Sequence, residues 1–198
     1  MAVSHTNSPT AAFPGGARLV GALDEAMREA GAAAVTDAVK QVLSDLIGNG
    51  NFELPAICYQ PSAEHYQRHE LYRSERHGYS VVAMTWAPEQ GTALHDHAGL
   101  WCVEGVCAGG IEVEQYEPVE REVPDRYRFA RRQSHIARTG SAGSLIPPYE
   151  YHRISNPTAS EPAVSLHIYE QTMTECHVFE PLGEGWFRRE TRQLCFDD

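Results

Sequence analysis

Three histidines combine the residue type and the spacing most suited to chemistry in this chain. His95 and His97 are separated by one residue, and His152 follows much later. Side chains alternate along a strand, so two histidines one residue apart on a strand face the same side. A third imidazole from another strand would complete the group. The pattern predicts a metal site with open coordination positions; an accident of loop composition is the alternative.

Glycine, proline and asparagine residues at set distances from these histidines extend the pattern. In chain order the set is Gly91, His95, His97, Cys102 and Gly109, followed by Pro147, His152 and Asn156. This spacing resembles the two sequence motifs of the cupin superfamily. The resemblance implies a double-sheet jelly roll with the metal in the mouth of the barrel.

The common cupin pattern has a glutamate ligand where this chain has Cys102. Glu104 is nearby, but it lies two residues late for that spacing. The expected ligand set is therefore three neutral imidazoles without a carboxylate. A divalent ion in such a site keeps its full charge, which favours an anionic substrate such as a thiolate. Imidazole suits iron, zinc, copper and nickel alike, so these residues leave the metal open.

Further segments resemble the cysteine dioxygenase family of cupin thiol dioxygenases. They are Trp86, Leu94-His95-Asp96-His97 with Cys102 five residues on, the segment from Glu161 to Tyr169, and Glu175-Cys176-His177-Val178-Phe179. The resemblance extends over about residues 58–180. It implies that Fe(II), held by His95, His97 and His152, serves to convert a small thiol and O2 to a sulfinic acid. No external reductant is needed, because the thiol supplies the electrons.

A strand expected at residues 163–169 brings a second group of polar side chains together. Ser165, His167 and Tyr169 alternate, so all three face inward. The resemblance implies a hydrogen-bonded relay with the Tyr169 hydroxyl beside the iron. In that relay His167 holds the phenol and Ser165 holds the imidazole. The alternative is that these three residues form a polar core whose hydrogen bonds are satisfied within the protein.

Cys102 and Tyr169 correspond to the pair that becomes a thioether crosslink in some members of the family. This sequence has both partners, which permits the crosslink. A plain buried thiol is an equal alternative for Cys102. The predicted catalytic set is Tyr169, His167, Ser165 and Cys102.

Arg68 is the candidate for binding the carboxylate of the substrate. Residues 66–69 resemble the region where cysteine-type members have Tyr-x-Arg, and a guanidinium fork matches a carboxylate. Enzymes of the 3-mercaptopropionate type have Gln there, and Gln67 is one residue away, where a slip would reverse the strand face. A solvated surface charge is the remaining alternative. Tyr66, Trp86 and Cys176 complete the predicted substrate-binding set.

The residues after Tyr169 leave the thiol open. Cysteine-type members commonly have Ser-Pro-Pro there, in a loop near the substrate, whereas this chain has Glu170-Gln171-Thr172-Met173. L-Cysteine is the first candidate, and 3-mercaptopropionate and mercaptosuccinate are alternatives. The candidates for a second carboxylate contact are Arg73, Arg76 and Arg153. A non-oxidative metal-binding cupin is the rival function.

The elements that must position these residues are a helical layer and a β domain. Apolar residues three and four apart predict helices within 17–48, broken at Gly31 and ended at Gly48-Asn49-Gly50-Asn51. Short β-like runs follow from about residue 79. They cover 79–86, 100–107, 110–116, 144–146, 163–169 and 176–179. We expect a mainly β cupin jelly-roll barrel, with a flexible tail over 1–16 and a single domain over 17–198, helical over 17–50 and β over 55–198.

Composition narrows the class of protein. The 198 residues suffice for one core, and the formal net charge of −11 makes nucleic acid an unlikely partner. No apolar run approaches the ~20 residues that span a bilayer, and no secretory leader pattern is present. Five scattered cysteines without a CxxC pair indicate reduced thiols in the cytoplasm. The oligomeric state stays open, a monomer included.

Overall fold

The structure is a computed structural model that describes residues 12–50, 52–122 and 124–197. Its helices are α1 (Gly16–Ala26), α2 (Ala32–Gly48) and the short 3-10 helix η1 (Ala56–Tyr59). Its strands are β1 (Gln67–Arg73), β2 (Ser80–Trp86), β3 (Leu94–His95), β4 (Cys102–Ala108), β5 (Gly110–Glu122), β6 (Arg126–Arg138), β7 (Ala142–Leu145), β8 (His152–Ser155), β9 (Ala163–Tyr169), β10 (Glu175–Gly183) and β11 (Trp186–Gln193).

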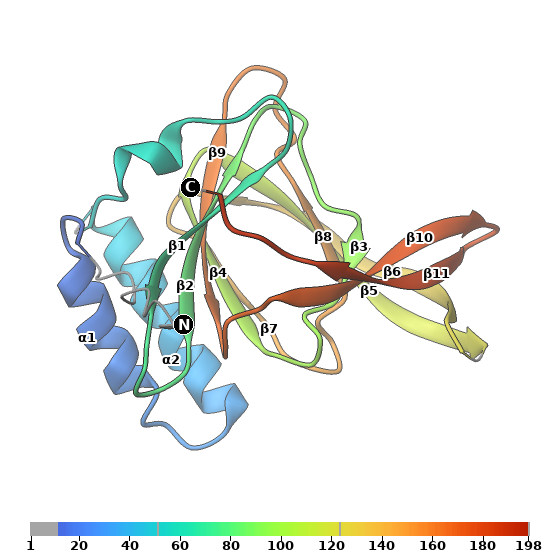
Figure 1. Ribbon diagram of the computed structural model, residues 1–198, viewed down its shortest axis with the longest axis horizontal. Coiled ribbons are helices and arrows are strands. Elements are labelled where there is room, and N and C mark those ends of the chain that lie inside the picture. The colour runs from blue at the N-terminus through green and yellow to red at the C-terminus, as the bar shows by residue number, and fades with distance from the viewer. Residues whose placement is uncertain (1–11, 51, 123, 198) are drawn as a thin grey trace, which may run out of the picture.

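The strands form two sheets around a common interior. The first has the order β1-β2-β9-β4-β7, and the second runs β10-β11-β6-β5-β8-β3 and closes because β3 pairs with β10. All the pairings within them are antiparallel. The two helices lie on one side of the molecule, and the β5–β6 and β10–β11 hairpins extend to the opposite side (Figure 1). The expected mainly β cupin fold with an N-terminal helical layer is confirmed.

Helix α2 covers the outer face of the first sheet, so the central strands of that sheet are buried on both faces. In β9 every residue is buried. Val164, Leu166 and Ile168 pack with the helices in one apolar cluster. The alternate residues of the strand face the interior between the sheets, where Ala163 and Tyr169 join a second cluster. One face of β9 therefore packs on the helices with apolar side chains, and the other face carries three polar side chains into the barrel.

Close contact between α2 and β4 depends on a glycine. A Cβ on Gly105 would lie 2.9 Å from Ile47 Cδ1 and 3.3 Å from Leu43 Cδ1. The helix therefore rests directly on the backbone of β4. The neighbouring residues Cys102 and Glu104 consequently point the other way, into the barrel.

The helical predictions agree with the structure. The chain breaks at Gly31, which has a φ of 87°, and α2 ends at Gly48. Of the expected tail, residues 1–11 lie outside the described residues. The end of the expected tail, from Phe13 to Gly16, belongs to the folded unit. Phe13 is buried and its ring packs against that of Phe52, and α1 begins at Gly16.

The sequence pattern did not predict two of the longer strands, β6 and β11. β6 and β11 are largely exposed and rich in arginine, so they lack the alternating apolar pattern of a half-buried strand. Among the described residues no helix is long and apolar enough to cross a membrane. All five cysteines are free.

Candidate metal centre

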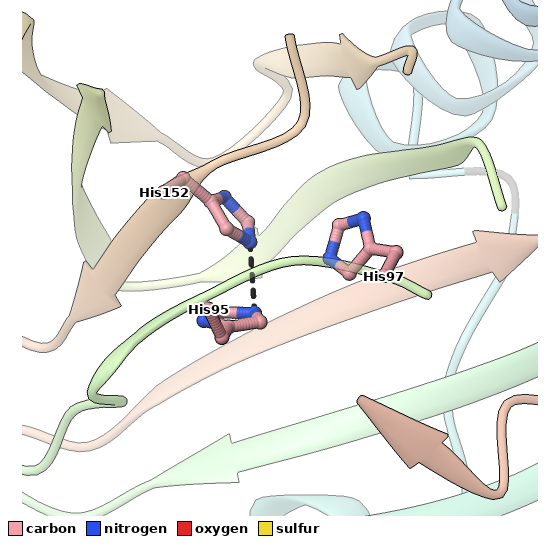
Figure 2. A group of neighbouring side chains, drawn as sticks. All are labelled: His95, His97 and His152. Atoms are coloured by element: carbon pink, nitrogen blue, oxygen red, sulfur yellow. Dashed lines mark hydrogen bonds between the residues drawn. The ribbon is translucent and has the colours of Figure 1, made fainter. Parts of the chain in front are cut away.

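The three predicted histidines meet at one point inside the barrel. His95 on β3 is the direct partner of His152 on β8, and their Nε2 atoms are 3.0 Å apart. One ligand atom from each of His95, His97 and His152 lies within 4.8 Å of the others. Figure 2 shows the three rings converging, with His97 beside the contact that joins the other two. No other group of this kind occurs in the part of the chain that the structure describes.

The backbone around these histidines differs from the expected continuous strand. β3 ends at His95, and His97 lies in the turn that follows. Asp96 holds this turn, because its carboxylate accepts hydrogen bonds from the backbone N–H groups of His177 (2.9 Å) and Ala98 (3.0 Å). The backbone N–H of Asp96 donates to the His177 carbonyl in return. His97 therefore reaches the site although it follows the strand's end.

Burial keeps the three imidazoles neutral. It lowers the pKa of His95 to about 4 and the pKa values of His97 and His152 well below their usual range. The Nδ1 atom of His95 lies 3.1 Å from the Ala93 carbonyl. A proton on Nδ1 donates to that oxygen and leaves the Nε2 lone pair free toward His152. Three neutral nitrogen donors fit a divalent transition metal, and they leave its identity open.

The histidines line a small cavity of about 30 Å³. Its other polar residues are Tyr66, Arg68, Thr92, His167, Tyr169, Cys176 and Arg192. Met84, Met173, Val178 and Leu194 supply apolar wall. Among the described residues that line it, none carries a carboxylate and the two arginines alone carry a formal charge.

The inward side chains of β9 take part in a chain of hydrogen bonds. Trp86 Nε1–H donates to Ser165 Oγ at 2.9 Å, and Ser165 Oγ lies 2.8 Å from His167 Nε2. Ser165 Oγ has two lone pairs, so it accepts from Trp86 and either donates to Nε2 or accepts from an Nε2–H, according to the tautomer of His167. Burial lowers the pKa of His167 to about 3, in keeping with a neutral ring.

His167 does not hold the phenol as the resemblance implied. Its ring stacks on that of Tyr169 with centroids 6.0 Å apart, and its Nδ1 lies 3.9 Å from Cys102 Sγ and 3.7 Å from Glu104 Oε2. Tyr169 instead lies across from His97, with ring centroids 5.7 Å apart, and is the direct partner of Cys102 in the ladder between β4 and β9. The phenol is thus positioned by the β4 side, because β4 and β9 pair residue by residue.

Glu104 is a largely buried acid, with a side chain 13% exposed, whose surroundings the sequence did not reveal. Its Oε2 atom is buried and has no hydrogen-bond partner. Burial raises the pKa of Glu104 to about 7. Glu104 and Ser165 also line a second cavity of about 150 Å³. Its spacing from the histidines gave no signal, since it falls outside the cupin ligand position.

Arg68 lies inside the protein and not on its surface. It is 5% exposed, and its Nη2 is buried without a partner at the metal cavity. The segment Cys195–Asp197, here called the C-terminal strap, holds it. Arg68 Nη1 donates to the Cys195 carbonyl at 3.2 Å, the guanidinium lies 5.0 Å from the Phe196 ring centroid, and the Arg68 backbone N–H donates to Asp197. Gln67 is not among the residues that line the cavity.

Of the other predicted substrate-binding residues, two line the cavity and one packs against residues beside it. Tyr66 and Cys176 line the cavity. Trp86 does not line the cavity. It is fully buried, stacks on Tyr66 at 4.8 Å and donates to Ser165, because β2 pairs with β9 in the same sheet. Contact between Trp86 and the substrate stays a prediction, and the structure places Trp86 outside the residues that line the cavity.

The loop after Tyr169 turns away from the metal cavity. Glu170, Gln171 and Thr172 line a separate surface pocket with His77, and only Met173 reaches the metal cavity. Arg73 is paired with Glu70 on the surface. Arg192, which no motif marked, lines the cavity instead, because the β10–β11 hairpin returns the chain to the site.

The fold and the site together define a cupin barrel with a three-histidine metal-binding centre. The family model for cysteine dioxygenase type I matches residues 63–181. The chain belongs to the cysteine dioxygenase type I family.

The chain is also similar to individual members and to solved structures. It is 22% identical to cysteine dioxygenase type 1 of Homo sapiens and 24% identical to that of Bos taurus, each over 102 residues, 52% of this chain and 50% of the relative. The chain thus spans about half the length of these curated relatives. TT1209 from Thermus thermophilus is a solved structure with a TM-score of 0.44 and 20% identity, over 59% of this chain and 95% of that chain.

Proposed function

We propose that the protein is a non-haem iron thiol dioxygenase that converts a small thiol carboxylate and O2 to the sulfinic acid. The observation that carries the proposal is one cavity that brings together three neutral histidines, the Tyr169 phenol and the Arg68 guanidinium. His95, His97 and His152 would hold the metal. When bound, Fe(II) supplies a redox centre at which a thiolate and O2 react.

Arg68 orients the substrate in this proposal. Its unpartnered Nη2 is a buried donor at the cavity wall, and a substrate carboxylate would satisfy it. The C-terminal strap fixes the guanidinium, so part of the ordering is complete before the substrate binds. Membership of the family favours L-cysteine among the candidate substrates, whereas the charges of the cavity wall favour mercaptosuccinate over L-cysteine and 3-mercaptopropionate.

Tyr169 acts as a hydrogen-bond donor. Burial raises the pKa of its phenol well above the usual range, so the hydroxyl keeps its proton at neutral pH. A protonated phenol can donate to oxygen as negative charge develops there. The ladder with β4 keeps Tyr169 beside the histidines, and Ser165 orients His167 behind it.

The reaction balances without a further reductant. Sulfur loses four electrons and gains both oxygen atoms of O2, and the carbon–sulfur bond stays intact. The test is oxygen uptake by the iron-loaded protein with L-cysteine, 3-mercaptopropionate and mercaptosuccinate, with mass detection of the sulfinate. His152→Ala is the control. Sulfinate formation that disappears in the variant supports the proposal.

Metal analysis separates this proposal from the rival, a non-oxidative metal-binding cupin. Protein that contains stoichiometric zinc, gives no sulfinate with any thiol after iron loading, and shows no thiol-induced change in its iron spectrum would favour the rival. A variant lacking His152 that is as active as the parent would also overturn the dioxygenase proposal.

A further inference from the structure

We propose that Arg192 forms a second anion-binding subsite at the rim of the metal cavity, which makes a thiol with two carboxylates the preferred substrate class. The inference rests on the proposed function and ranks its candidate thiols. Arg192 lies on β11 opposite Cys176 of β10 and lines the same cavity as Arg68. Leu194, which follows the end of β11, lines it as well.

The two arginines differ in depth, which gives the cavity an inner and an outer positive group. Arg68 is buried and fixed by the strap, whereas the Arg192 side chain is 48% exposed. A thiol whose first carboxylate reaches Arg68 would present a second acidic group toward Arg192. Both guanidinium groups act on the same cavity residues, since each lowers the pKa values of Tyr66 and Cys176 against the effect of burial.

The charge of the wall favours anions without an ammonium group. The neutral histidines and the two arginines face no carboxylate among the described residues of the wall. A bound ammonium would meet two cations and no acidic partner there, and an unpaired charge in a confined site is costly. A dicarboxylate thiol would instead pair both of its charges.

The present partner of Arg192 can be exchanged. Its Nη2 atom lies 3.4 Å from Glu180 Oε1, and the Glu180 side chain is itself 40% exposed. A pair of this kind contributes little, because water solvates both groups well when they separate. A substrate carboxylate can therefore take over the guanidinium while Glu180 returns to solvent.

The experiment compares mercaptosuccinate with 3-mercaptopropionate as substrates of the iron-loaded protein. The measured quantity is the ratio of the two kcat/KM values in the parent, Arg192→Gln and Arg192→Lys. We expect Arg192→Gln to lower the ratio about tenfold and Arg192→Lys to restore most of it. Arg188→Gln is the matched control, because Arg188 is an exposed arginine of the same strand that does not line the cavity. Thermal melting verifies that each variant is folded.

A binding measurement makes the result independent of turnover. Succinate and propionate, which lack a thiol, are titrated into the iron-loaded protein without oxygen. The parent should bind succinate more tightly than propionate, and Arg192→Gln should remove that difference. If succinate binds in this way but no thiol is oxidised, the proposed function fails and the subsite stands. If thiols are oxidised but the substrate ratio is the same in Arg192→Gln and Arg188→Gln, the subsite is refuted.

Discussion

Cys102 and Tyr169 are direct partners across the antiparallel ladder between β4 and β9. Both residues are buried in the interior between the two sheets. Opposed side chains in such a ladder have Cβ atoms about 5 Å apart, which is close enough for a bond between sulfur and the ring after a small movement. The β-sheet thus brings the two residues together without any contribution from the metal.

A thioether crosslink is therefore expected when the iron-loaded protein turns over in air. The sulfur–carbon bond forms with the loss of two hydrogen atoms, and O2 is the oxidant. Mass spectrometry of the intact protein and of its peptides should show this loss and a linked Cys102–Tyr169 peptide. Cys102→Ala is the control and should retain the unmodified mass. An unlinked tyrosine in the parent after many turnovers would contradict the expectation.

Loss of the Arg68 fork should weaken the use of carboxylate substrates. Arg68→Gln is expected to lower kcat/KM about 100-fold, because a charge-assisted pair in a buried site is lost. The kcat/KM of Arg68→Lys should lie between those of the parent and Arg68→Gln, since a lysine keeps the charge but cannot form two parallel hydrogen bonds to a carboxylate. Arg73→Gln is the control on the same strand, where the guanidinium is paired on the surface. Equal losses in Arg68→Gln and Arg73→Gln would refute this role.

Glu104 should make the folded protein less stable as the pH rises. Its pKa is raised from 4.5 to about 7, so between these values the folded state retains a proton that the unfolded state has released. The free energy of unfolding should fall by about 3 kcal/mol across this window. The contribution is complete below pH 4.5 and lost above pH 7.

Urea unfolding at pH 4.5 and pH 7.5 tests this dependence. Glu104→Gln should remove that part of the pH dependence, because glutamine does not titrate. Glu120→Gln, which alters an exposed carboxylate on β5, is the control and should follow the parent. Parallel pH profiles for the parent and Glu104→Gln would show that Glu104 titrates normally.

Metal binding should stabilise the fold through the three histidines. Fe(II) added without oxygen at about 100 times its dissociation constant should raise the melting temperature by about 5–10 °C. The rise should disappear in His152→Ala. His135→Ala is the control, because His135 is not part of the histidine group. A similar rise in both variants would place the metal elsewhere.

Much of the site could be predicted because its residues follow local rules. Ser165, His167 and Tyr169 alternate on one strand, and alternation alone places them on one face. The same holds for the helices, since the break between them falls at Gly31, whose φ of 87° is one that other residues avoid. Such features depend only on residues close together in the sequence, so they can be predicted before the fold is known.

The parts that could not be predicted depend on contacts between distant segments. Trp86 donates to Ser165 from the neighbouring strand, which depends on the register between β2 and β9. Arg192 reaches the cavity because an exposed, arginine-rich hairpin folds back, and no apolar pattern marks that hairpin. Glu104 is a buried acid in a strand whose outer face is closed by a helix. Each of these follows from packing between segments and not from residue type.

The C-terminal strap gives the two halves of the site different resistance to local opening. Asp197 and Arg68 are joined across 129 residues of chain, and the strap is irregular backbone, whereas His95 and His152 face each other within a closed sheet. Segments held by few contacts open at lower free energy than the sheet. Amide hydrogens of the strap should therefore exchange with deuterium well before those of β3 and β8. On warming, the protein should lose the fixed position of Arg68, and with it the binding of the substrate carboxylate, while the three histidines are still in place.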